Sequence, residues 1–133
     1  MVKNNIVRPN VLIILLDGVR PDRIKNNPDF SSLKRKGLFF NNMFTTSPYT
    51  LASLHSLFTG IYGSRNGVDG YYKINHLDSN CKTLAEYLSE EEYLTWGDPM
   101  RKELCPSRGF QKYDASTEDK YELLTRHKKI VDE

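Results

Sequence analysis

Thr50, at the expected start of a helix, carries a hydroxyl group that could do chemistry. Pro48 predicts a turn, residues 51–58 have the spacing of an amphipathic helix, and Gly60 is typical of a helix end. Thr50 would therefore lie beside backbone N–H groups and the positive end of the helix dipole, where an oxyanion is stabilised. This position suits a nucleophile that attacks an anionic ester. The alternative is that Thr50 only caps the helix, because threonine is a common N-cap residue.

Asp17 is the second residue with a candidate chemical role. It follows residues 11–16 (VLIILL), an unbroken apolar run typical of a strand buried on both faces of a parallel sheet. Ligands of open α/β sheets bind beyond the carboxyl ends of the strands, and a carboxylate suits a divalent cation. We therefore expect Asp17 and Thr50 to share one cation, with their oxygens roughly 4–6 Å apart. The alternative is that Asp17-Gly18 forms an ordinary turn.

Helices and further strands must position these two residues. We expect a helix over residues 29–37 that Asp29 caps and Gly37 closes, with Phe30 and Leu33 facing inward. The other expected elements are a second strand at 38–46, a helix at 83–91 with a Thr83–Glu86 capping box, a third strand at 93–96 and an amphipathic helix at 117–131. Strands that alternate with helices predict an α/β fold with a mainly parallel sheet flanked by helices.

The expected helix after Thr50 has two kinds of surface. Its apolar face comprises Leu51, Leu54, Leu57 and Phe58, and its stripe of small residues comprises Ala52, Ser53, Ser56 and Gly60. The small residues would let the helix lie close against other backbone. His55 shares a side with Leu51 and Phe58, so we interpret it as a packing residue.

Composition and charge exclude several classes of function. The chain has 133 residues, is 38% hydrophobic and carries a formal net charge of +2. This balance favours neither nucleic acid nor a membrane as a partner. The six-residue apolar run is far shorter than the roughly 20 residues that span a bilayer, and no signal peptide is recognisable. We therefore expect a cytoplasmic protein, with Cys81 and Cys105 as free thiols.

The order of motifs along the chain resembles the N-terminal part of the sulfatases and their relatives in the alkaline phosphatase superfamily. The matching stretches are RPNVLIILLDGVRPD at residues 8–22, TSP at 46–48, SLFTGIY at 56–62, NGV at 66–68, TLAEYL at 83–88 and RGFQKYD at 108–114. Their order and spacing are more specific than any single motif. The resemblance implies an incomplete alkaline-phosphatase-like α/β fold.

The resemblance also implies roles for Asp17 and Thr50. Asp17 matches the family's first metal-binding aspartate. Typical sulfatases have a second aspartate at the next position, whereas this chain has Gly18 there, as the phosphodiesterase-like branch does. Counted back from the Thr59-Gly60 pair, Thr50 matches the nucleophile position and would also contact the metal. Sulfatases carry a Cys-x-Pro-x-Arg pattern there, in which cysteine becomes formylglycine. The proline and arginine are missing here, and oxidation of threonine would give a ketone in place of an aldehyde.

An unmodified threonine nucleophile is typical of the phosphodiesterases and phosphotransferases of the superfamily, in which a metal ion activates it. The resemblance therefore favours zinc as the divalent metal, or calcium if the protein is a true sulfatase. The substrate would be an anionic sulfate or phosphate ester. A second cysteine motif, Cys105-Pro106-Ser107-Arg108, lacks the residue between cysteine and proline, and we interpret it as a coincidence.

The remaining metal ligands of the family come from a later part of a much longer domain, and this chain lacks those motifs. We therefore expect residues 8–133 to be the N-terminal portion of a sulfatase-like hydrolase or transferase domain, with residues 1–7 as a short extension. It would be inactive alone and would need a missing C-terminal portion or a second chain. The alternative is a non-catalytic remnant or an α/β module that binds a partner along an exposed sheet edge.

Overall fold

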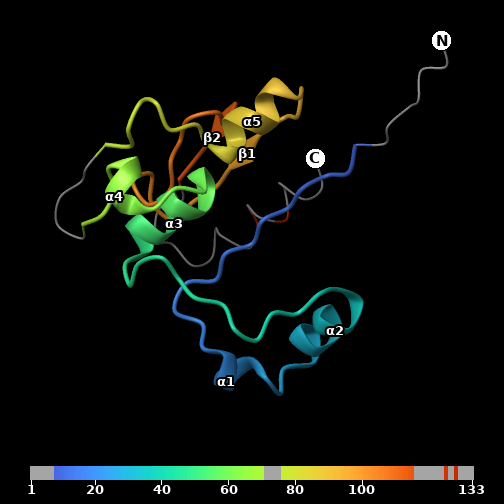
Figure 1. The fold of residues 1–133 in the computed structure, drawn as a ribbon. Coiled ribbons are helices and arrows are strands. Elements are labelled where there is room, and N and C mark those ends of the chain that lie inside the picture. The colour runs from blue at the N-terminus through green and yellow to red at the C-terminus, as the bar shows by residue number, and fades with distance from the viewer. Residues whose placement is uncertain (1–7, 71–75, 116–124, 126–127, 129–133) are drawn as a thin grey trace, which may run out of the picture. The chain divides into compact units, whose positions relative to one another are not determined.

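The computed structural model describes residues 8–70 and 76–115, together with residues 125 and 128. In chain order the elements are α1 (Pro21–Ile24), α2 (Pro28–Lys36), α3 (Thr50–Thr59), α4 (Gly63–Asn66), α5 (Leu84–Glu90), β1 (Trp96–Gly97) and β2 (Lys112–Tyr113) (Figure 1). They fall into two compact units, Met1–Asn42 and Met43–Glu133. None of the helices in the described ranges is long and apolar enough to cross a membrane.

The first unit contains the helices α1 and α2. Both begin at a proline, which suits the first helical turn because its missing N–H would have no partner there. The side chain of Asn27 accepts hydrogen bonds from the N–H groups of Asp29 and Phe30, and so caps α2. The prediction that Asp29 is the cap is therefore wrong, because the helix begins one residue before it.

Neither α1 nor α2 buries a residue. Leu33, predicted to face inward, is 67% exposed, and Phe30 is half-buried. The Lys34 ammonium lies 4.1 Å from the ring centroid of Phe39, so the basic end of α2 rests on an aromatic side chain. The buried residues within the described ranges all belong to the second unit.

The predicted strand at residues 11–16 does not form. These residues carry no regular secondary structure, and their side chains are 44–71% exposed. A strand exists through hydrogen bonds to a neighbouring strand, and no strand within the described ranges pairs with this segment. The prediction of a buried central strand is thus wrong for this structure, although the run is as apolar as such a strand requires.

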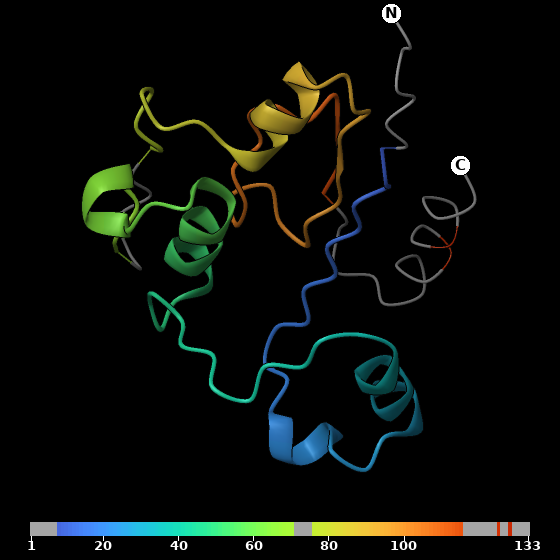
Figure 2. The same ribbon diagram turned by 45° about the vertical axis from the view of Figure 1, so that its right-hand side comes forward.

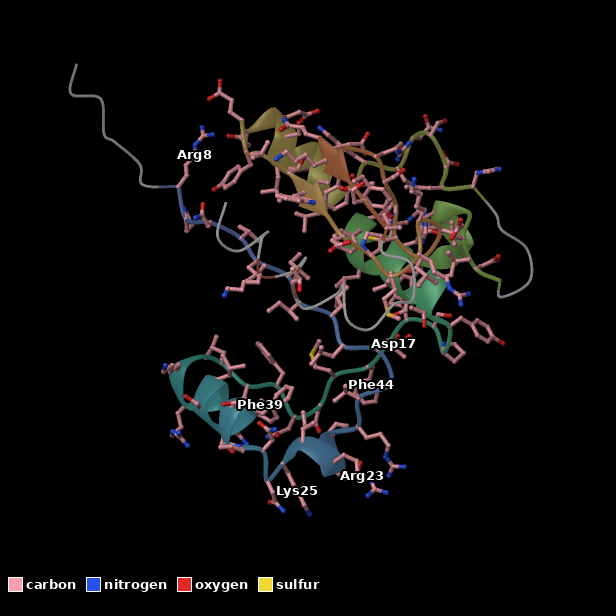
Figure 3. The ribbon with its side chains drawn as sticks, turned by 180° about the vertical axis from the view of Figure 1, so that it is seen from behind. Arg8, Asp17, Arg23, Lys25, Phe39 and Phe44 are labelled. Atoms are coloured by element: carbon pink, nitrogen blue, oxygen red, sulfur yellow. The ribbon has the colours of Figure 1, made fainter. Side chains whose placement is uncertain are left out.

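The predicted second strand at residues 38–46 is also absent. This segment contains no helix or strand, and its aromatic residues Phe39, Phe40 and Phe44 are exposed (Phe39 and Phe44 are labelled in Figure 3). The same physical reason applies, because apolar content predicts burial only where another element covers it.

In its described residues, the second unit comprises the helices α3, α4 and α5 and a two-stranded sheet (Figure 2). Helix α3 packs against both α4 and α5. The predicted capping box at the start of α5 is confirmed: the Thr83 hydroxyl accepts from the Glu86 N–H at 3.1 Å, and the Glu86 carboxylate accepts from the Thr83 N–H at 2.8 Å. The predicted end of α3 at Gly60 is confirmed as well, and Gly60 is left-handed there, with φ of 68°.

The sheet pairs β1 with β2 in parallel, with Trp96 opposite Lys112 and Gly97 opposite Tyr113. Within the described ranges these are the strands of the fold, so the mainly parallel sheet of the prediction is present as one short pair. The predicted strand at 93–96 overlaps β1 only at Trp96. The predicted helix at 117–131 lies outside the described residues, apart from Thr125 and Lys128.

A small core joins the helices to the sheet. Its buried hydrophobic residues are Ala52, Phe58, Val68, Cys81, Ala85 and Cys105. The ring of Phe58 on α3 meets the ring of Phe110 edge to face, with centroids 6.1 Å apart, and Phe110 also contacts Tyr113 of β2 at 5.5 Å. Both cysteines are free thiols, as the sequence predicts. The ring of Phe110 thus connects α3 to β2.

Candidate functional site

Thr50 is the first residue of α3. The N-cap residue is Tyr49, whose extended backbone has φ of −110° and ψ of 134°. Thr50 therefore stands one residue inside the helix, and the alternative that it is the N-cap residue is wrong. Its side chain is half-buried at the positive end of the helix dipole. The predicted placement of a hydroxyl in the first turn of this helix is confirmed.

The loop that leads into α3 is organised by hydroxyl groups. The Thr45 hydroxyl donates to the Ser47 carbonyl at 2.8 Å and lies 2.9 Å from the Ser53 hydroxyl. The Ser47 hydroxyl accepts from the Tyr49 N–H at 3.3 Å. Sequence reasoning missed this network, because Thr45 and Ser53 are eight residues apart and meet only where the loop turns into α3.

The buried face of α3 differs from the predicted one. Ala52, His55, Ser56 and Phe58 are buried, whereas Leu57 of the predicted apolar face is exposed. Two residues of the small-residue stripe, Ala52 and Ser56, are therefore buried, whereas none of the leucines is. This agrees with the expectation that small residues let the helix lie close to other backbone.

His55 is a packing residue, as predicted. Its Nδ1 is 2.9 Å from the Leu51 carbonyl one turn earlier in α3, so this nitrogen carries the proton and donates. Burial lowers the pKa of His55, and the hydrogen bond to Leu51 opposes that change only in part. With Nδ1 as the donor, the unprotonated nitrogen of the neutral ring is Nε2.

The burial of His55 predicts that the chain loses stability in mild acid. A depressed folded-state pKa means that the unfolded chain takes up a proton first, so the contribution of His55 is complete above about pH 6.5 and declines as pH falls below it. Urea unfolding at about pH 7.5 and about pH 5.5 measures this. His55→Gln should lose less stability than wild type on acidification, and His76→Gln, which changes an exposed histidine, should behave like wild type. An unchanged pH dependence in His55→Gln would contradict the assignment.

Asp17 lies in a turn of the first unit. It is exposed, and Gly18 follows it with φ of 68°, a left-handed conformation that favours glycine (Figure 3). The Asp17-Gly18 turn of the alternative interpretation is thus present, whereas the predicted strand before it is not. Asp17 and Thr50 belong to different units, so their predicted proximity stays a prediction.

The described residues contain no group of three or more His, Cys, Asp or Glu side chains that could hold a metal ion. Asp17 and Thr50 offer a carboxylate and a hydroxyl oxygen, which are hard donors suited to a divalent cation. Two donors are too few for a tight site, because divalent cations in proteins have about four to eight ligands. The donor chemistry fits such an ion, and the donor number requires additional ligands.

The cysteine motif at residues 105–108 has a structural role. Burial raises the pKa of the Cys105 thiol to about 12, so little of the reactive thiolate is present at neutral pH. Arg108 donates to the carbonyls of Ser79 and Cys81 and lies 3.7 Å from the Glu86 carboxylate. The interpretation of this motif as a coincidental match is supported, because its arginine fastens the chain ahead of α5.

The residues after Arg108 lock α5 to β1, a role that sequence reasoning missed. The Thr83 hydroxyl donates to the Arg108 carbonyl at 2.8 Å, and the Thr95 hydroxyl donates to the Gly109 carbonyl at 2.6 Å. Gly109 has φ of 86° and packs on the backbone of Glu86. The Arg-Gly-Phe sequence is therefore explained by packing rather than by chemistry.

Comparison with known proteins places these features in a family context. The family model described as Sulfatase matches residues 9–128 of the chain. Searches of curated proteins and of solved structures gave no match. The matched range includes Asp17, the whole of α3 with Thr50 at its start, and both strands.

Proposed function

The chain belongs to the sulfatase family, and from this membership we propose that Thr50 is the nucleophile of a metal-dependent hydrolase or transferase acting on sulfate or phosphate esters. Sulfatases act on sulfate esters and generally use a divalent metal ion. The observation that supports the proposal most strongly is the position of Thr50. It opens α3, and the helix ends at Thr59 and Gly60, as the nucleophile helix of the family does.

Thr50 would act through its hydroxyl oxygen. Oγ1 forms a bond to the sulfur or phosphorus atom while the bond from that atom to the alcohol oxygen breaks. The threonine hydroxyl gives its proton to solvent, and the released alkoxide takes up a proton from solvent and leaves as the alcohol. Water then cleaves the esterified threonine and restores Thr50. The first turn of α3 stabilises the negative charge that develops on the ester oxygens.

Asp17 would share a divalent ion with Thr50. When bound, such an ion lowers the pKa of a coordinated hydroxyl and offsets the charge of the ester. The threonine favours zinc and phosphoester chemistry, and calcium remains the choice for a true sulfatase. Because this chain contributes one carboxylate and one hydroxyl, the other ligands would come from a C-terminal portion or a second chain.

Turnover assays with aryl phosphate, phosphodiester and aryl sulfate test the proposal, with zinc or calcium added. We expect the 133-residue chain alone to show no hydrolysis above background, since its two donors bind a metal weakly. Together with the C-terminal portion or second chain that supplies the other metal ligands, it should turn over substrate. Thr50→Ala should then abolish the activity without unfolding the protein. Thr50→Ser, which keeps the hydroxyl, should retain part of it.

Two outcomes would contradict the proposal. Turnover that survives Thr50→Ala would remove Thr50 from the mechanism. Turnover by the 133-residue chain alone, lost on chelation and in Asp17→Ala, would show that these residues suffice and that no further portion is needed. The second candidate, a non-catalytic remnant, predicts no turnover in any combination.

A further inference from the structure

Thr45 ties the loop before α3 to the first turn of that helix. Its hydroxyl donates to the Ser47 carbonyl at 2.8 Å, accepts from the Ser47 N–H at 3.4 Å and meets the Ser53 hydroxyl at 2.9 Å. One threonine oxygen thus contacts the loop two residues later and the helix eight residues later. All of these groups lie in the second unit.

The protons of this network can be assigned. A hydroxyl has one proton, and that of Thr45 goes to the Ser47 carbonyl. The contact with Ser53 therefore uses the Ser53 proton, which is donated to Thr45. The Thr45 oxygen accepts from both Ser53 and the Ser47 N–H, so a side chain without an oxygen at position 45 loses all three interactions.

The Thr45 hydroxyl and its contacts with Ser47 and Ser53 are called the brace below. Thr50 lies between Ser47 and Ser53 in the sequence. On its N-terminal side the Tyr49 N–H donates to the Ser47 hydroxyl at 3.3 Å. On its C-terminal side Ser53, one helical turn later, donates its N–H to the Tyr49 carbonyl at 2.9 Å and its hydroxyl to Thr45. Ser47 and Ser53, which flank Thr50, are therefore connected to one another through the Thr45 oxygen.

We propose that Thr45 is a positioning residue for Thr50, and this rests on the proposed nucleophilic role of Thr50. Thr45 is exposed, so its hydroxyl contributes little to the stability of the core. Its effect is on the direction of the Thr50 side chain, because it fixes the turn from the loop into α3. A nucleophile misplaced by about 1 Å can lose about 100-fold in rate.

Three variants of the chain separate this role from general stability. Thr45→Val removes the hydroxyl at nearly constant volume, and Thr45→Ser restores it. Thr46→Val is the matched control, because the hydroxyl of the adjacent Thr46 makes no hydrogen bond in the described structure. Amide hydrogen exchange at Ser47, Tyr49 and Ser53 reports the brace without any need for catalysis.

We expect Thr45→Val to speed exchange at these amides by up to about tenfold, with the midpoint of global unfolding little changed. Thr45→Ser and Thr46→Val should exchange like wild type. Exchange in Thr45→Val that equals wild type would show that the brace does not order the loop, and would overturn the proposal.

Kinetics on a form that turns over substrate complete the test. Thr45→Val should lower kcat by about 10- to 100-fold with KM changed by less than about twofold, and Thr45→Ser should recover most of kcat. Faster exchange with an unchanged kcat would overturn the positioning role while leaving Thr50 as the nucleophile. Turnover that survives Thr50→Ala would instead refute the proposed function itself, so the two failures are distinguishable.

Discussion

Gly109→Ala should unfold the second unit under conditions in which the wild-type unit is folded. The backbone of Gly109 has φ of 86°, which L side chains rarely adopt. A Cβ atom there would lie 2.2 Å from the Glu86 nitrogen and 2.5 Å from the Ala85 carbonyl carbon. These are backbone atoms of α5, so the helix itself would have to move. We expect a loss of more than about 4 kcal/mol.

Gly60→Ala is the matched control for this substitution. Gly60 also has positive φ, 68°, but a Cβ atom there would meet nothing within 4 Å. It should therefore cost only the left-handed backbone strain, about 1–2 kcal/mol. Urea unfolding followed by circular dichroism compares the two variants. Equal losses would show that the contact of Gly109 with α5 is not what requires glycine.

Asn66→Asp should produce the second large loss of stability. Asn66 is fully buried, and its amide is used on both sides: Nδ2 donates to the Ile61 carbonyl at 2.9 Å, and Oδ1 accepts from the Val68 N–H at 2.8 Å. An ionised carboxylate would still accept from the Val68 N–H, but it has no proton to donate to the Ile61 carbonyl. Because the site excludes water, that carbonyl would have no other donor. We expect a loss of about 2–4 kcal/mol at neutral pH.

The pH dependence of Asn66→Asp identifies the cause of that loss. Burial and the facing carbonyl raise the pKa of the introduced carboxyl, because they disfavour its charged form. Its protonated form can donate to the Ile61 carbonyl, so the deficit relative to wild type should shrink as pH falls from about 7 toward about 5. Asn42→Asp, at an exposed position, should show neither the loss nor the recovery. A deficit that does not change with pH would contradict the account.

Local signals in the sequence predicted α2, α3 and α5, whereas α1 and α4 were not predicted. The capping box of α5 and the left-handed Gly60 depend on residues within one turn of each other, so their types suffice. Asn27 in place of Asp29 as the cap of α2 is an error of two residues between side chains that cap equally well. The cap is the residue before the first helical residue, and here Pro28, which is favoured at that first position, makes Asn27 the cap.

Strands could not be predicted in the same way. Residues 11–16 have the composition of a buried strand, yet composition does not supply the neighbour that a strand needs. β1 and β2 do pair. The hydroxyl and the carbonyl of Thr95, just before β1, both accept from the N–H of Gln111, just before β2, and so align the two strands. That alignment joins residues 16 apart in sequence, and no local pattern announces it.

The candidate site was predictable only in part for the same reason. The position of Thr50 follows from local helix signals, and the structure confirms it. The brace through Thr45 and the seat of Gly109 on α5 arise from contacts between segments, so residue types alone do not indicate them. The proposed shared cation would take one ligand from each unit, Asp17 and Thr50, and that proposal rests on family membership.

Manganese titration of the ¹⁵N-labelled chain tests that shared cation most directly. A bound paramagnetic ion broadens the amide signals of residues close to it, even when binding is weak. If Asp17 and Thr50 hold one divalent ion, their signals should broaden together at the same manganese concentration, and Asp17→Ala should abolish both effects. A Thr50 signal that stays sharp while Asp17 broadens, or that broadens equally in Asp17→Ala, would contradict the account.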